Sequence, residues 1–319
     1  MNDFHLCRGL EVLVYKDKMQ FDGNEFEQKV RQYYYVEKDN LIKWMNDGKL
    51  RYLYNNGVFE EEKLRYFDAI YFAPDVYYSS KDEEGLSRFS FMENGTEYLF
   101  EIESEKSLCR IEYNPGNSVL MIPTSGDRQL LFYTKTGERL WVYDEEEIVK
   151  GTELEIVRFP SVVDDVVVII SEIITKSIRK AQGFKIRTGE KLWELRDDVC
   201  PRHLFEGDDK MLYGCLSIYD ELVLCRLDPF TGKFDKWAVK RDEDISVCSW
   251  NVSMHNNRLY YSSNRPDCEF GIIDCGKKEL VESVALGLKS GYQIGAPKIS
   301  DGKAYVFSRF AGELRVYEL

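Results

Sequence analysis

Short apolar stretches alternate with polar turns along most of the chain, and the stretches have the two-residue period of β-strands. Counted from residues 68, 116, 164, 208, 256 and 301, the polar turns recur at steps of 48, 48, 44, 48 and 45 residues. The runs that follow them are rich in Val, Ile, Tyr and Phe, which favour strands. Asp, Asn and Gly at the turns tolerate the left-handed backbone that tight hairpins need. The pattern predicts a repeated unit of short antiparallel strands.

A second turn signal falls between the first ones: a strand, a tight turn ending in Gly, then a strand carrying Trp. The clearest copies are Leu131–Trp141, with Gly137, and Gly183–Trp193, with Gly189. A third copy runs through Gly232 to Trp237. Weaker copies place turn glycines at Gly57, Gly95 and Gly276. Successive turn glycines are 38 to 52 residues apart. Two interleaved signals at one period indicate about four strands in each repeat.

Sheets of this size cannot bury both faces alone, so they must stack on their neighbours. Radial closure is the usual solution for repeats of this length. Dividing 319 residues by seven gives about 46, close to the observed period. We therefore predict an all-β protein, a single β-propeller over residues 1–319 with about seven four-stranded blades. Six or eight blades remain open alternatives.

The two ends of the chain suggest how the ring closes. The last repeat has strands predicted at Lys303–Phe307 and Glu313–Tyr317 but no fourth strand. We expect the apolar run Leu10–Tyr15, within residues 1–20, to supply that strand. Residues 24–66 then form an irregular first blade, in which Phe26, Val30 and Tyr33 have helical spacing. The long repeat around Gly189 is explained by a bulged loop or short helix at Ser171–Gln182.

The strand–Thr-Gly-Glu-x-Leu-Trp phrase resembles the quinoprotein-like, PQQ-type repeat of β-propellers. The resemblance implies that Trp141, Trp193 and Trp237 pack between neighbouring blades. The PQQ-dependent dehydrogenases of that family use a vicinal Cys-Cys disulfide and a calcium site, in a longer, secreted chain. This sequence has no Cys-Cys pair and no leader, so we expect no cofactor. The alternative WD-repeat interpretation lacks both the Gly-His and the Trp-Asp signatures.

Composition changes the expected partners. The chain has 43 Lys and Arg against 56 Asp and Glu, a net charge of −13. A negative surface repels nucleic acid and anionic membranes, so neither is expected as a partner. No apolar stretch reaches the ~18 residues of a membrane span. Residues Met1–Leu10 lack the features of a signal peptide, which predicts a cytoplasmic location.

Candidate catalytic chemistry is sparse. The eight cysteines are scattered, which predicts reduced and mostly buried thiols, although a Cys268–Cys275 disulfide is open. His5, His203 and His255 are isolated, so no histidine metal site is expected. A Cys200–His203 pair could serve nucleophilic catalysis, but an interblade loop explains it as well. No phosphate-binding loop or GxSxG motif occurs, and no calcium loop.

Acidic runs could in principle supply the paired carboxylates of a glycoside hydrolase. They lie in predicted turns and outer loops, where solvated faces are the usual explanation. These runs are Glu60–Glu62, Asp82–Glu84, Asp144–Glu147, Asp197-Asp198 and Asp242–Asp244. We therefore assign no catalytic, cofactor-binding or metal-binding residue from the sequence.

The function predicted from these features is a non-catalytic protein-binding module. An acidic rim with exposed tyrosines suits a basic protein partner. One specific version is an immunity-type protein that blocks a basic toxin. Two alternatives stay open: an enzyme acting on carbohydrate or lactone at the central channel, and a scaffold or sensor that binds a small ligand there.

Overall fold

A computed structural model of the chain describes residues 3–7, 10–14, 18–21, 24–27, 37–38, 41–46, 50–55, 58–63, 69–73, 76–79, 86–93, 96–103, 112–114, 116–123, 129–144, 154–156, 160–173, 178–197, 200–241, 244–263, 268–288, 294–308 and 311–319. The regular structure in these residues is entirely β-strand. All strand pairings in these residues are antiparallel. Consecutive strands of a sheet pair in order, except that the first two strands of the fifth sheet both pair with its third. The prediction of an all-β protein is confirmed.

Four sheets come from the first half of the chain. The first contains β1 (Asp3–Cys7), β2 (Leu10–Val14), β3 (Lys18–Phe21) and β4 (Asn24–Glu27), and the second β5 (Glu37–Lys38), β6 (Leu41–Asn46), β7 (Leu50–Asn55) and β8 (Val58–Lys63). The third contains β9 (Ala69–Ala73), β10 (Val76–Ser79), β11 (Leu86–Glu93) and β12 (Thr96–Glu103), and the fourth β13 (Glu112–Asn114), β14 (Val119–Pro123), β15 (Gln129–Thr134) and β16 (Arg139–Asp144).

Four more sheets follow. The fifth contains β17 (Leu154–Ile156), β18 (Ser161–Val163), β19 (Val166–Ile173), β20 (Ile178–Lys185) and β21 (Lys191–Arg196), and the sixth β22 (Phe205–Glu206), β23 (Leu212–Ile218), β24 (Glu221–Leu227) and β25 (Phe234–Ala238). The seventh contains β26 (Val252–His255), β27 (Arg258–Ser263), β28 (Glu269–Asp274) and β29 (Glu279–Ala285), and the eighth β30 (Lys298–Ser300), β31 (Lys303–Ser308) and β32 (Glu313–Glu318).

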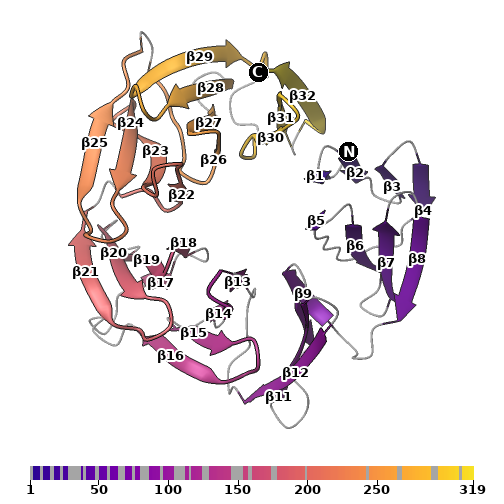
Figure 1. Ribbon diagram of the computed structural model, residues 1–319. Helices are drawn as coiled ribbons and strands as arrows, with labels where there is room; N and C mark the ends of the chain where they lie inside the picture. The colour runs from indigo at the N-terminus through magenta and orange to yellow at the C-terminus, as the bar shows by residue number, and fades with distance from the viewer. Residues whose placement is uncertain are drawn as a thin grey trace.

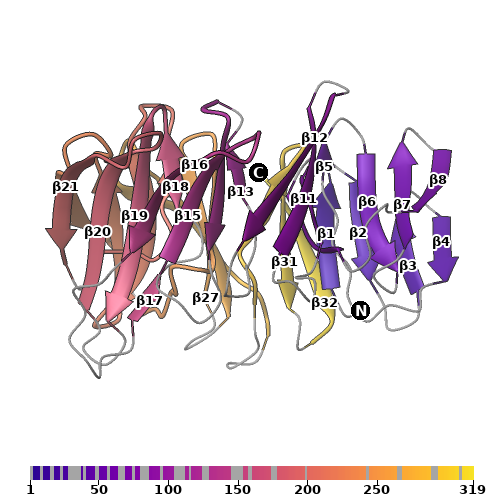
Figure 2. The same cartoon turned by 90° about the horizontal axis from the view of Figure 1, so that it is seen from below.

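The sheets are arranged radially as the blades of a β-propeller (Figure 1). Outermost strands such as β16, β21, β25 and β29 lie on the outside of the ring. Seen from the side, the strands run up and down between its two rims (Figure 2). The described residues form eight sheets, the number that the sequence left open beside the preferred seven.

The N-terminal part of the chain explains the extra blade. Leu10–Val14 was expected to complete the last blade, but as β2 it pairs with β1 on one side and β3 on the other. The predicted closing strand is therefore wrong, because both edges of that strand are already used. Residues 24–66 are likewise divided: β4 belongs to the first sheet, and β5–β8 form the second. The helical spacing at Phe26 is not realised, since Asn24–Glu27 is a strand, while Val30 and Tyr33 lie outside the described residues.

In the later blades, one prediction is confirmed and another is wrong. In the described residues the eighth sheet has three strands, as the sequence predicted for the last repeat. The long fifth repeat contains neither a helix nor a bulged loop at Ser171–Ile173 and Ile178–Gln182. These residues extend the paired strands β19 and β20, each eight residues long.

The core lies between neighbouring blades. One buried cluster joins the fourth and fifth sheets through Phe132 and Ile169, and another joins the sixth and seventh through Leu224 and Tyr261. Comparable clusters join the fifth to the sixth sheet and the seventh to the eighth. Both faces of a middle strand are therefore apolar, as in β14, where every residue is buried. Burial on this scale, at roughly 25 cal/mol per Å² of apolar surface, is what holds one blade to the next.

The two rims of the ring differ. In a four-stranded meander, the first and third turns of every blade fall on one rim, and the second turn and the link to the next blade fall on the other. We call these the turn rim and the connection rim. Both turn signals of the sequence lie on the turn rim, at left-handed residues such as Asp164 (φ 49°), Asn256 (48°) and Gly189 (71°). The polar-turn prediction is confirmed there, because residues that tolerate positive φ occupy these turns.

Two repeat tryptophans fasten adjacent blades together. Trp141 Nε1 donates a hydrogen bond of 2.8 Å to the Ile186 carbonyl, and Trp193 Nε1 donates one of 2.7 Å to the Pro229 carbonyl. Each acceptor lies in the turn between the third and fourth strands of the next blade. Each indole also covers the turn glycine, so that a Cβ on Gly189 or Gly232 would come within 2.6 or 2.7 Å of the ring. Trp and Gly in the repeat phrase are thus two halves of one contact.

The contact changes in the later copies. In the strand register, the position of Trp193 corresponds to Asp235 in the sixth blade. Trp237, which pairs with Leu224, lies two residues further along its strand. Its ring lies 4.0 Å below the ammonium of Lys278 in the next blade. Lys278, and not Gly276, takes the left-handed position there, with φ 62°. The sequence alignment of Gly276 with Gly232 was therefore wrong by two residues. Gly137 has the expected positive φ of 86°, and Gly57 and Gly95 lie outside the described residues.

Candidate functional site

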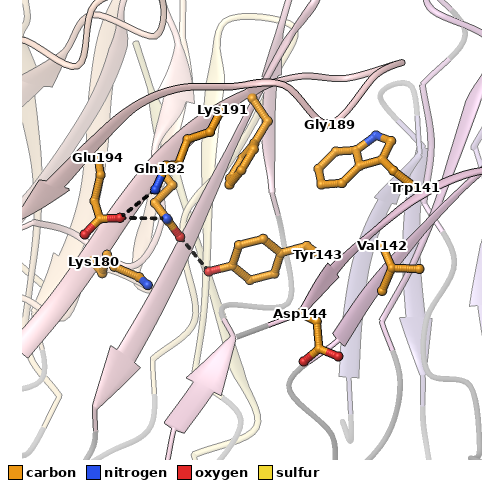
Figure 3. A pocket seen from close by; sticks show the side chains of 10 residues that line it. Trp141, Val142, Tyr143, Asp144, Lys180, Gln182, Gly189, Lys191 and Glu194 are labelled. Atoms are coloured by element: carbon orange, nitrogen blue, oxygen red, sulfur yellow. Dashed lines mark hydrogen bonds and ion pairs between the residues drawn. The ribbon is translucent and has the colours of Figure 1, made fainter. Parts of the chain in front are cut away.

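An open groove of about 460 Å³ lies between the fourth and fifth blades (Figure 3) and is lined in part by their outermost strands β16 and β21 (Figure 1). We call it the interblade groove. One wall is β16, with the side chains of Trp141, Val142, Tyr143 and Asp144. The other wall comes from β20, β21 and the turn between them, with Lys180, Gln182, Phe184, Gly189, Lys191 and Glu194. Its size is in the range of small-molecule sites in proteins.

A chain of hydrogen bonds crosses the groove. Tyr143 donates to Gln182 Oε1 at 2.7 Å, and Gln182 Nε2 donates to Glu194 Oε2 at 3.0 Å (Figure 3). Burial raises the pKa of Tyr143 to about 12, so its hydroxyl stays protonated and remains a donor. The ring of Tyr143 meets Phe184 edge-on, with centroids 5.5 Å apart. The base of the groove is therefore ordered and partly aromatic.

Charged groups surround this chain. Glu194 accepts from Lys191 at 3.3 Å and from Arg196 at 3.0 Å. Burial raises the pKa of Glu194, but these hydrogen bonds outweigh it and hold the pKa below its usual range. Burial also lowers the pKa of Lys180, against the opposing effect of Glu194. On the facing wall, Asp144 accepts from Gln129 at 2.6 Å.

The connection rim carries exposed aromatic residues. Tyr219, in the hairpin turn between β23 and β24, is 97% exposed and has a left-handed backbone with φ 48°. The Asp220 carbonyl accepts from the Ile245 amide at 3.0 Å, which ties this turn to the link between the sixth and seventh blades. Asp220, Glu221 and Asp244 around it are all exposed.

Trp250, in the same link, is 51% exposed. The Arg202 guanidinium lies 5.4 Å from its ring centroid, and the Arg202 amide donates to Ser249 Oγ at 3.2 Å. Arg202 also forms an ion pair with the buried carboxylate of Glu172, which Arg179 approaches to 3.5 Å. The fifth, sixth and seventh blades thus meet at one point of the connection rim.

The other candidates from the sequence do not converge. Cys268 and Cys275 are both free thiols, so the disulfide left open by the sequence is absent. Burial raises the pKa of Cys200 to about 12 and lowers that of His203, which opposes the ion pair that a nucleophilic Cys–His couple needs. His255 is exposed at the end of β26.

The acidic runs are also dispersed. Glu60–Glu62 lies within β8, and Asp197 accepts from Lys236 at 3.0 Å. Asp82–Glu84, Asp198, Glu145–Glu147 and Asp242-Glu243 lie outside the described residues, as does the side chain of His5. Where the structure describes side chains, no group of three or more His, Cys, Asp and Glu is placed to hold a metal ion. The described residues include no helix that is long and apolar enough to span a membrane.

Sequence comparisons give no relative: no protein-family model matches the chain, and no curated protein matches it. Solved structures match its fold. The structure of the dihydro-heme d1 dehydrogenase NirN in complex with DHE is 10% identical and has a TM-score of 0.57, covering 98% of this chain and 73% of that one.

Two further structures match over most of both chains. The β-propeller domain of Myceliophteria thermophila Cps50 (Swd1) is 12% identical with a TM-score of 0.51, covering 91% of this chain and 98% of that one. Hsv2 of Kluyvelomyces marxianus is 8% identical with a TM-score of 0.52, covering 90% and 91%. At these identities the likeness establishes the β-propeller fold and nothing about activity.

Proposed function

We propose that this β-propeller is a non-catalytic module that binds a protein partner through its connection rim. The observation that carries the proposal is Tyr219, a bulky residue held in a left-handed turn and 97% exposed. A left-handed backbone costs a non-glycine residue about 1–2 kcal/mol. Because the Tyr219 side chain is almost fully exposed, packing of its ring does not offset this cost. Strain without a structural return is typical of a functional position.

The surroundings of Tyr219 favour a basic partner. Asp220 and Glu221 follow Tyr219 directly in the chain, and Asp244 precedes Ile245, whose amide donates to the Asp220 carbonyl; all three acidic residues are exposed. A Lys or Arg side chain of a partner can pair with a carboxylate and stack on an aromatic ring. The net charge of −13 would speed the approach of a positively charged protein. Trp250 and Arg202, also on the connection rim, belong to the residue types most enriched among interface hot spots.

Two finer statements accompany this proposal. A cytoplasmic immunity-type protein that neutralises a basic toxin is the version that best joins the acidity to the exposed rim. Membership of the quinoprotein-like repeat family is supported by the Trp–Gly contacts of Trp141 and Trp193, which serve the interblade role that the resemblance implies.

The test is affinity purification from the cells that produce the protein, with captured proteins quantified by mass spectrometry. The variants are Tyr219→Asn, which keeps a residue suited to the left-handed turn, and Trp250→Ala. Phe230→Ala is the matched control, because Phe230 is 38% exposed in a turn on the opposite rim. We expect one basic protein to be lost with both rim variants and retained with Phe230→Ala.

Salt gives a second criterion. Binding of a basic partner should weaken several-fold between low and high ionic strength, because exposed charge pairs are screened. A partner retained equally by wild type and both rim variants would refute the proposed face. A captured partner that is acidic and insensitive to salt would refute the proposed chemistry.

A further inference from the structure

The eighth blade has an open outer edge in the described residues. Its sheet contains three strands, β30–β32, whereas each of the other seven described sheets contains at least four. The outermost of the three is β32 (Figure 1). The N-terminal strands β1–β4 pair with one another in a sheet of their own. Within the described part of the chain, β32 is therefore paired on its β31 side alone.

The register of β32 identifies the backbone groups on its outer edge. The Leu319 amide donates to the Gly302 carbonyl at 2.8 Å, and these two residues continue the pairing of β31 with β32. Hydrogen-bonded pairs alternate with non-bonded pairs along an antiparallel ladder. Counting back from residue 319, the odd-numbered residues bond to β31. The backbone N–H and C=O groups of Leu314, Val316 and Glu318 therefore point to the outer edge.

This edge has few of the features that prevent edge strands from pairing. Proline and bulges protect many natural edges, but β32 contains no proline and pairs with β31 without a register shift. Its charges are balanced within the blade, since Arg315 contacts Glu313 at 2.8 Å and Glu318 lies 3.6 Å from Lys303. Val316 is 45% exposed. The edge is thus suited to accept another strand.

The seventh blade carries an acid at the position of the repeat tryptophan. In the fifth blade, Trp193 lies four residues after Gly189, which has a left-handed backbone. In the seventh blade, the same count from the left-handed Lys278 gives Glu282. Both strands also have a register shift directly before this residue. Glu282, which is exposed, therefore replaces the tryptophan.

The side chain of Glu282 lies on the face toward the eighth blade. Residues directly opposite each other in a sheet share a face, and Glu282 pairs with Ile272, which belongs to the cluster that joins the seventh and eighth blades. Between the fourth and fifth blades, Trp141 has the same position and lines the groove together with Lys191 and Glu194 of the next fourth strand. A fourth strand on the eighth blade would present its equivalent residues to Glu282.

We propose that the outer edge of β32 binds an extended basic segment of a partner protein, which adds the fourth strand of the eighth blade. Backbone hydrogen bonds to Leu314, Val316 and Glu318 supply affinity, and Glu282 selects Lys or Arg in the incoming strand. The site lies on the outside of the ring and does not depend on the binding role proposed for Tyr219.

The probe is the fluorescein-labelled peptide Lys-Leu-Trp-Lys-Leu-Arg. It copies the fourth strand of the fifth blade, Lys191–Arg196, with Glu194→Lys, so that both residues equivalent to those facing Trp141 are basic. One control peptide has Glu in place of every basic residue. A second keeps all side chains but carries N-methyl groups on its backbone amides, which removes its hydrogen-bond donors. In fluorescence anisotropy titrations with the full chain, we expect the first peptide alone to bind.

Val316→Pro tests the edge directly. It removes an amide donor from the outer edge and leaves the hydrogen bonds to β31 in place, so it should weaken peptide binding about tenfold. Val316→Thr is the matched control, because it keeps both the N–H and a β-branched side chain. It should bind like wild type. Thermal unfolding checks that both variants are folded.

Two further variants separate the chemistry and the site. Glu282→Lys should weaken peptide binding several-fold, because it replaces attraction by repulsion. Tyr219→Asn should bind the peptide like wild type, so this proposal and the rim proposal fail separately.

The proposal would be overturned by equal binding of the N-methylated peptide, by equal binding of the acidic peptide, or by unchanged binding to Val316→Pro. Absence of peptide binding to the wild-type chain would also overturn it. Sedimentation equilibrium adds a final criterion. If the wild type were a dimer that Val316→Pro converts to a monomer, the occupant of the edge would be a second copy of the chain rather than a basic segment of a partner.

Discussion

The indole of Trp193 and the backbone carbonyl of Pro229 are joined by a hydrogen bond of 2.7 Å that crosses from the fifth blade to the sixth. Trp193→Phe removes the donor but keeps most of the ring. We expect a loss of about 1 kcal/mol in the free energy of unfolding, measured by urea denaturation. Trp237→Phe is the comparison, because Trp237 meets Lys278 of the next blade through the face of its ring. An equal loss in both variants would contradict a specific role for the hydrogen bond.

Substitutions at two glycines distinguish the cost of a left-handed backbone from the cost of a clash with the indole. Gly232 and Gly302 have φ values of 74° and 71°, but only Gly232 lies against an indole. Gly302→Ala should cost about 1 kcal/mol, the strain of the left-handed backbone alone. Gly232→Ala should cost at least about 1 kcal/mol more, because its Cβ would meet Trp193. Equal unfolding midpoints would show that the Trp–Gly contact adds nothing.

Acid should weaken the interface between the sixth and seventh blades. Arg241 contacts Glu269 through both carboxylate oxygens, at 2.8 and 3.1 Å, and Tyr261 donates to it at 2.6 Å. Burial raises the pKa of Glu269, but these partners outweigh it and hold the pKa below the usual value of 4.5 for a glutamate. A lowered carboxyl pKa gives stability that is present above the unfolded-state pKa and lost as the pH falls through the folded-state pKa.

We therefore expect the urea midpoint of the wild type to fall as the pH drops below about 4.5. Glu269→Gln should start lower at neutral pH, since it leaves Arg241 buried without its counterion. Its midpoint should then change less with acidification. Parallel pH profiles for the two proteins would mean that Glu269 does not contribute to acid sensitivity.

Tyr219→Asn is expected to keep or raise stability while it reduces partner binding. Asn adopts a left-handed backbone more readily than Tyr, so relief of strain should contribute up to about 1 kcal/mol. Thermal unfolding of the purified variant measures this. A clear loss of stability would show that the Tyr219 ring packs in solution, and it would remove the main argument for a binding role.

The cysteines should differ in reactivity. Burial raises the pKa of Cys200 and Cys275 to about 12, whereas Cys248 is only partly buried. Since the thiolate is the reactive form, iodoacetamide at pH 8 should modify Cys248 well before the other two. Peptide mapping by mass spectrometry gives the order. Early modification of Cys200 would mean that the interface between the fifth and sixth blades opens in solution.

Much of the fold could be predicted because turn chemistry is local. Asp164, Asn256 and Gly189 mark their turns through backbone preferences that neighbouring residues alone impose. The first sheet was missed for the same reason. Its strands are short, its last strand Asn24–Glu27 is mostly polar, and the Thr-Gly and Trp signals do not occur there. Lys278 was missed because a lysine, rather than the nearby Gly276, takes the left-handed position of its turn.

The candidate sites could not be predicted in this way. Lys180, Gln182 and Glu194 alternate with apolar residues, which along a single strand indicates a solvent-facing side. Only the placement of β16 against β20 turns that side into a groove with Tyr143. Tyr219 resembles any surface tyrosine until its backbone φ of 48° is known. Relations between blades, rather than patterns within them, determine these sites.

The direction of the tryptophan contacts has a consequence for synthesis on the ribosome. Trp141 waits for Ile186, 45 residues later, and Trp193 waits for Pro229, 36 residues later. Each of these blades is therefore completed only after most of the following one has left the exit tunnel. Until then its outer strand exposes an indole that has no acceptor. Nascent chains paused about one repeat after Trp141 should be those most in need of a chaperone.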